Sequence, residues 1–197
     1  MLGFINRAFE SFICDTCGPD TWAQVSQRAG LGFDRFEPML PYDDSITEAM
    51  ISAACQVLRR PRDSILEDVG TYLVSHHNLE RLRRLLRFGG VDFVEFLHSL
   101  EDLPERGRLA LPELELPKLR LIEEGEGIFR LQCHMAIAGI GHVVVGLLRA
   151  MADDYGALVL IDFDTILPNA DEVVAIHLLD HRHSSGRSFD LTAVAQG

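Results

Sequence analysis

The chain has 197 residues, of which 47% are hydrophobic and 24% are charged, a balance typical of one compact domain or two small subdomains. Thirty acidic residues against eighteen basic ones give a formal net charge of −12. This charge excludes nucleic acid and anionic membrane surfaces as partners, because both are themselves negative. No apolar run approaches the roughly 20 residues of a membrane-spanning helix. Four scattered cysteines, and an N-terminus with Arg7 and Glu10 in place of an apolar signal segment, predict a cytoplasmic protein.

The first half of the chain has apolar residues at three- and four-residue spacing, which is the pattern of amphipathic helices. Glycines and prolines separate the periodic segments and mark where helices end. The sequence therefore predicts six helices, over about 3–13, 19–30, 43–58, 62–75, 78–87 and 91–103. Pro104 is expected to stop the sixth helix. The prolines and the weak periodicity between Glu105 and Pro117 predict a connecting loop.

After Lys118 the pattern changes to alternation of apolar and polar residues. Leu119 and Leu121, then Phe129 and Leu131, alternate with polar neighbours on either side of 125–127, which is typical of a β-hairpin. A helix is predicted over about 139–154, and strands over 157–163 and 173–179. The polar segment 181–197 contains Gly and Ser and is expected to be a flexible tail.

Five segments stand in a recognisable order along the chain: Met1–Ala8, Cys17–Trp22, Tyr42–Ser45, Val91–Leu97 and Gly139–Gly156. Together they resemble the heme nitric oxide/oxygen binding (H-NOX, HNOB) family, which includes the sensor domain of soluble guanylyl cyclase. The resemblance implies an α+β fold over residues 1–180. Its helical N-terminal lobe, about 1–104, is followed by a sheet lobe, about 118–180, in which a long helix packs on a four-stranded antiparallel sheet.

In the family that this sequence resembles, a proximal histidine ligates a heme and a Tyr-x-Ser-x-Arg motif binds the heme propionates. The resemblance places the histidine position on Pro104, and the Tyr, Ser and Arg positions on Cys133, Met135 and Ile137. Proline cannot ligate iron, and the other three residues do not keep the family's chemistry. Because each buried charge left unpaired costs several kcal/mol, we expect a divergent member that lacks heme.

The resemblance also implies an apolar pocket between the lobes, with the lining residues Phe4, Ile5, Leu73, Val74, Val143 and Leu147. It places His77 on the distal side, as the alternative axial ligand if heme binds after all. A void is costly in a close-packed interior. We therefore expect partial closure of the lobes, with a residual pocket near His77 that takes a small hydrophobic molecule.

Other candidate sites have simpler interpretations. Cys14 and Cys17 have the spacing of a zinc or redox motif, but no second pair completes a tetrahedral site. His98 lies between apolar stripe positions and is expected to face solvent. The sequence contains no phosphate-binding loop, nucleophile elbow or metalloprotease motif, so we expect neither an enzyme nor a metal site.

The expected function is that of a sensory or regulatory domain in bacterial signalling, which binds a ligand between its lobes. The partner class implied by the resemblance is a signalling protein such as a histidine kinase, a diguanylate cyclase or another cyclase. Two alternatives stay open. One is a genuine heme-based sensor of NO or O2 with His77 as axial ligand, and the other is an adaptor without a ligand.

Overall fold

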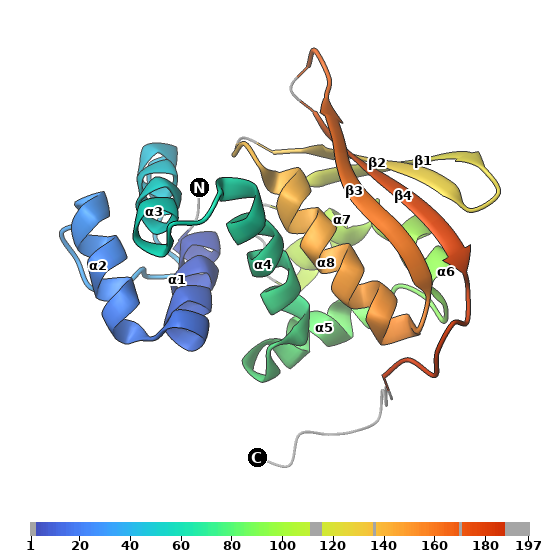
Figure 1. The fold of residues 1–197 in the computed structure, drawn as a ribbon, viewed down its shortest axis with the longest axis horizontal. Helices are drawn as coiled ribbons and strands as arrows, with labels where there is room; N and C mark the ends of the chain where they lie inside the picture. Colours follow the sequence, from blue (N-terminus) through green and yellow to red (C-terminus); the bar gives the residue numbers. More distant parts are fainter. Residues whose placement is uncertain (1–2, 111–115, 136, 170, 188–197) are drawn as a thin grey trace.

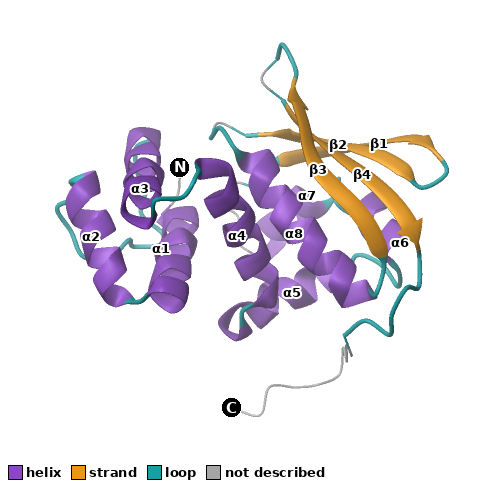
Figure 2. Cartoon of the chain, viewed as in Figure 1, coloured by secondary structure: helices purple, strands orange, loops and turns teal. Residues whose placement is uncertain are grey.

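The computed structural model describes residues 3–110, 116–135, 137–169 and 171–187 (Figures 1 and 2). Helices make up the first half of the described chain, and a sheet with one long helix makes up the second half. The elements in chain order are α1 (Gly3–Cys17), α2 (Pro19–Ala29), α3 (Asp44–Leu58), α4 (Arg62–Ser75), the 3-10 turn η1 (His77–Leu79), α5 (Glu80–Arg87), α6 (Phe93–His98), α7 (Leu103–Ala110), β1 (Lys118–Gly125), β2 (Ile128–His134), α8 (Ile140–Tyr155), β3 (Leu158–Ile166) and β4 (Glu172–Asp180).

The helices largely follow the predicted segments, with one clear error around Pro104. The predicted helix over 91–103 is confined to α6, and Pro104 lies in the first turn of α7 instead of ending the preceding helix. Proline is favoured at that position because the first N–H groups of a helix have no partner within the helix. The predicted loop is therefore wrong for 105–110, and residues 111–115 of it lie outside the described residues.

The four strands form one antiparallel sheet in the order β1-β2-β4-β3. The alternation noted in the sequence puts one face of the sheet against α8, where buried strand residues such as Leu131, Val174 and Ile176 share a core with Leu148 and Met151. Figure 1 shows α8 crossing this face of the sheet. The predicted α+β class and the helix-on-sheet arrangement are confirmed.

The described chain has two apolar cores, and the boundary between them lies at a different place from the boundary between the predicted lobes. One core contains buried residues of α1, α2, α3 and α4. The other contains residues of α5, α6, α8 and the sheet, and Val74 at the end of α4 also belongs to it. The helices α5 and α6 therefore pack with the sheet, although the sequence places them in the helical lobe. The helix α4 lies between the two cores.

The helices α4 and α8 cross with their backbones in direct contact, and two glycines permit this approach. A Cβ atom on Gly70 would lie 1.9 Å from the Val143 carbonyl oxygen, and one on Gly146 would lie 1.8 Å from the Glu67 carbonyl oxygen. Neither backbone atom can move away independently. The crossing therefore fixes how the first core sits against the second.

Replacing Gly70 by alanine is expected to destabilise the fold by about 1–3 kcal/mol, which is the usual cost of overpacking. This cost exceeds the gain of up to about 1 kcal/mol in helix propensity. Urea denaturation followed by circular dichroism measures the change. Gly125→Ala is the matched control, because a Cβ there meets nothing within 4 Å. If Gly70→Ala were as stable as Gly125→Ala, the two helices would not be in the described contact.

The start of the predicted tail is attached to the end of α8. The Ser184 N–H donates to the Gly156 carbonyl at 3.0 Å, and the Arg187 N–H donates to the Asp154 carbonyl at 3.0 Å. Residues 188–197 of the predicted flexible tail lie outside the described residues. Among the helices of the described ranges, none is long and apolar enough to cross a membrane.

Candidate functional site

An apolar cavity of about 200 Å³ lies at the seam between the two cores. Its walls come from α1, α3, α4, α5 and α8, together with residues around α7, β1 and the segment between β2 and α8. Of the described lining residues, Thr47 alone has a hydroxyl, amide or charged side chain. The Thr47 hydroxyl donates to Asn6 Oδ1 at 2.8 Å, so its proton is already used. The cavity wall is therefore almost entirely hydrocarbon.

The cavity includes five of the lining residues that the resemblance implied: Phe4, Ile5, Leu73, Val143 and Leu147. The other two expected site residues, Val74 and His77, are not among the described lining residues. Val74 is 2% exposed and packs into the core of the sheet, because successive helical residues point about 100° apart and Leu73 faces the cavity.

The expectation of a pocket beside His77 needs correction. The helix α4 ends at Ser75, and His76 has an extended backbone conformation. The helix therefore does not continue to His77, which starts η1 with an exposed side chain. The His77 ring lies tilted against the His76 ring, with 4.4 Å between the ring centroids.

Of the four positions that the resemblance assigns to heme binding, two line the cavity and two do not. Met135 and Ile137 line the cavity, where they add to its apolar wall. Pro104 is buried at the start of α7 and is not among the described lining residues. Cys133 is fully buried in the core of the sheet. Burial, and then the negative charge of Glu172, raise the pKa of the Cys133 thiol to about 12. It therefore stays protonated near neutral pH and offers no thiolate.

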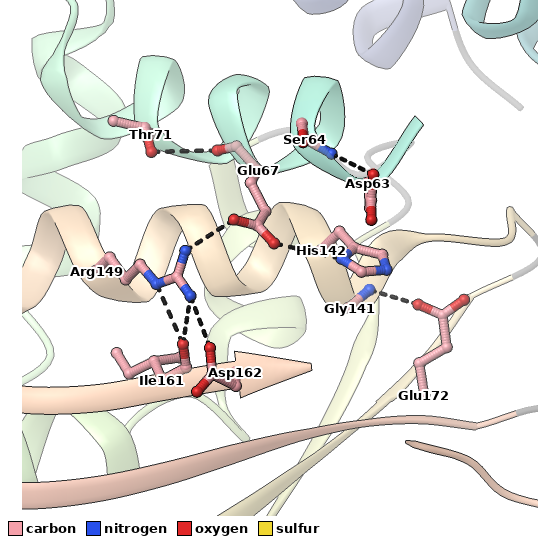
Figure 3. Close-up of polar contacts among 10 residues, drawn as sticks. All are labelled: Asp63, Ser64, Glu67, Thr71, Gly141, His142, Arg149, Ile161, Asp162 and Glu172. Atoms are coloured by element: carbon pink, nitrogen blue, oxygen red, sulfur yellow. Dashed lines mark hydrogen bonds and ion pairs between the residues drawn. The ribbon is translucent and has the colours of Figure 1, made fainter. Parts of the chain in front are cut away.

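A carboxylate from β4 occupies the N-terminus of α8, beside the cavity. Glu172 is 5% exposed, and it accepts hydrogen bonds from the Gly139 N–H at 2.5 Å and the Gly141 N–H at 2.6 Å. Figure 3 shows the Glu172 side chain directed at Gly141. A helix N-terminus is the usual backbone site for an anion. Here the chain's own carboxylate fills it, next to Gly139 of the cavity wall.

The sequence analysis did not identify Glu172, although the lack of a capping side chain before α8 was a signal. The helix α8 begins after Gly139, which provides no side-chain cap. A long helix without a Ser, Thr, Asp or Asn cap requires another acceptor for its first N–H groups. The sequence does not indicate that the acceptor lies about thirty residues later, because the contact depends on how β4 packs.

Arg62 on α4 lies beside the cavity wall and is paired with Glu48. Its guanidinium forms a bidentate pair with Glu48, at 2.7 and 2.9 Å, and also donates to the Ala138 carbonyl at 2.8 Å. A Cβ on Gly139 would lie 3.6 Å from Arg62 Nε, which places the guanidinium beside the cavity wall. Arg62 therefore joins α3, α4 and the start of α8 around the rim.

The polar face of α8 joins this helix to α4 and β3. Glu67 accepts a hydrogen bond from Arg149 at 2.7 Å and lies 3.5 Å from His142 Nδ1 (Figure 3). Arg149 also donates to Asp162 at 3.0 Å, and the His142 ring stacks on Phe163. These contacts hold α8 in place between α4 and the sheet.

The residues of the cavity do not fit heme. Histidine, cysteinate and tyrosinate are the common axial ligands, and the described lining contains none of the three. The thioethers of Met50 and Met135 are present, but methionine ligation in cytochromes accompanies a histidine. Two donor groups beside the cavity wall, Arg62 and the N-terminus of α8, already bind Glu48 and Glu172. Heme would therefore find no iron ligand in the described lining, and Arg62 and the N-terminus of α8 would not be free to bind its propionates.

The remaining sequence candidates do not converge on a second centre. Cys14 and Cys17 lie near the end of α1 as free thiols, and His98 is exposed with its Nε2 4.0 Å from Glu123. Within the described ranges, no three His, Cys, Asp or Glu side chains gather as a metal site.

The sequence matches curated proteins that are longer than this chain. It is 25% identical over 154 residues to the soluble guanylate cyclase gcy-31 of Caenorhabditis elegans, and 25% identical over 155 residues to gcy-32 of the same organism. These matches cover 78% and 77% of this chain but only 22% and 23% of the relatives. The chain thus spans less than a quarter of their length.

Solved H-NOX structures share the fold. An H-NOX protein from S. oneidensis superposes with a TM-score of 0.74 at 18% identity, covering 91% of this chain and 100% of that one. One from K. algicida gives a TM-score of 0.76 at 17% identity, over 92% of this chain and 98% of that one. The Haem-NO-binding family model matches residues 2–162. This chain belongs to the Haem-NO-binding family, whose domains are heme-based gas sensors without catalytic activity of their own.

Proposed function

We propose that this domain works as a sensory or regulatory module without heme, and that it responds to a different ligand held in the apolar cavity. The observation that carries this proposal is the lining of the cavity. Met135 and Ile137 form part of its wall at two positions where the resemblance implies a propionate clamp, and the described lining has no histidine.

The packing around the cavity supports a regulatory role. The cavity lies between two cores that α4 and α8 connect, so a bound molecule contacts both cores at once. Such a molecule binds one arrangement of the cores better than another, and by doing so it shifts the equilibrium between them. A change in the relative position of the cores is then available to a partner protein.

A signalling protein is the partner class that we propose, with a bacterial histidine kinase or a cyclase as the first candidates. The relatives that match this chain are named as soluble guanylate cyclases, and the matched part is less than a quarter of each. We propose that this signalling takes place in the cytoplasm of a bacterium.

The heme content of the protein made in cells tests this function. We expect the domain, expressed in a bacterial host supplied with 5-aminolevulinate, to be purified without stoichiometric heme in a pyridine hemochrome assay. One heme per chain would contradict the proposal. In that case the same assay on His77→Ala, with His98→Ala as control, decides whether His77 is the axial ligand.

A further inference from the structure

We infer that the cavity is a binding site for a small neutral hydrocarbon-like molecule of about the size of toluene, and that it excludes carboxylic acids of the same shape. This inference rests on the proposed function, because it names the ligand class of the same cavity. Three features of the described residues lead to it: the lining of the cavity, its size and the charges at its rim.

The lining limits the ligand to apolar groups. Thr47 has the one hydroxyl of the described wall, and its proton is bonded to Asn6. A polar ligand would therefore lose its hydrogen bonds to water without gaining replacements. An apolar ligand loses nothing comparable and removes its own surface from water.

The size of the cavity limits the ligand to a small molecule. An engineered apolar cavity of about 150 Å³ stays dry and binds benzene. Pockets for drug-sized ligands are larger, about 300–1,000 Å³. At about 200 Å³, this cavity lies between the two and is suited to a molecule slightly larger than benzene.

The charges at the rim exclude an acid. Two carboxylates, Glu48 and Glu172, stand there against one guanidinium, Arg62. Every one of these groups has a partner within the protein: Glu48 pairs with Arg62, and Glu172 accepts from the N-terminus of α8. An anionic head group would find no free donor among these groups. The same arrangement imposes no cost on a neutral molecule.

The cavity lining reaches the surface at two residues. Phe4 on α1 is 41% exposed, and Ala138, just before α8, is exposed.

Toluene and benzoate form a matched pair of probes. They share a phenyl ring, which has a methyl group in toluene and a carboxylate in benzoate. We expect toluene to bind the domain at one molecule per chain, with shifts of cavity methyl signals in NMR spectra and a higher melting temperature. Benzoate is expected to bind at least about 100-fold more weakly, since burial of an unpaired carboxylate is strongly unfavourable. Equal affinity for the two probes would overturn the proposed ligand class.

A cavity-filling variant locates the site. Ala8→Leu extends a side chain from α1 into the cavity, and it should reduce the affinity for toluene by about tenfold or more. Ala23→Leu adds the same atoms to an exposed position on α2 and should leave toluene binding unchanged. Equal toluene binding by both variants would place the probe elsewhere and overturn the inference, as would absence of any toluene binding by the unmodified chain. These measurements of toluene binding do not depend on whether the chain binds heme. Stoichiometric heme, by contrast, would refute the proposed function itself.

Discussion

Replacement of Asp154 by alanine is expected to lower the free energy of unfolding by about 3–5 kcal/mol, the usual cost of removing one partner of a buried ion pair. Asp154 lies near the C-terminus of α8, and its side chain is fully buried. Arg83 on α5 donates to both of its carboxylate oxygens, at 2.6 to 3.1 Å. Arg87 Nε lies 3.6 Å from the same carboxylate, and its guanidinium stacks 3.8 Å above the Tyr155 ring.

The loss is large because the variant leaves the Arg83 guanidinium, 16% exposed, without its counterion. It also releases α5 from α8, and α5 contributes Leu82, Leu85 and Leu86 to the cavity wall. Urea denaturation measures the effect. The neighbouring Asp153 is exposed, so Asp153→Ala is the matched control and should change stability by no more than about 0.5 kcal/mol. Equal losses for the two variants would show that the buried pair does not hold α5 to α8.

Heme affinity is expected to stay weak in Pro104→His, and to rise by at least about 100-fold when Cys133→Tyr, Met135→Ser and Ile137→Arg are added to it. By the family resemblance, histidine at position 104 would supply an iron ligand, but the two propionates would still meet Met135 and Ile137 of the cavity wall. Each unpaired buried charge costs several kcal/mol, and about 2.7 kcal/mol corresponds to a factor of 100 in affinity.

Hemin titration with absorption detection measures both affinities. Pro104→Ala is the control, because it removes the proline ring from the start of α7 without adding a ligand. Tight hemin binding by Pro104→His alone would show that the propionate clamp matters less than its chemistry suggests. Equally weak binding by both variants would also contradict this prediction.

Much of the fold can be predicted from local patterns in the sequence. The residues 62–75 form α4 with the predicted bounds, between Pro61 and the polar pair His76–His77. The hairpin of β1 and β2 is predicted by alternation around Gly125 and Gly127. The prediction at Pro104 is wrong because proline both ends helices and begins them, and the sequence around it does not distinguish the two roles.

The candidate site is only partly predictable. Apolar wall residues such as Ile5 and Leu147 are identified through the family resemblance, and they line the cavity. His77 is not among the described lining residues, because α4 ends at Ser75 and His76 has an extended backbone conformation. The contact of Glu172 with α8 links residues about thirty positions apart. Such contacts arise from the packing of complete elements, so no local pattern in the sequence reports them.

The absorption spectrum of the unmodified domain after addition of hemin and gel filtration tests the absence of heme binding most directly. We expect the protein peak to elute without a Soret band, because the described lining of the cavity has no axial histidine and the Arg62 guanidinium beside it is already paired with Glu48. A sharp Soret band that stays with the protein at one heme per chain would contradict this expectation.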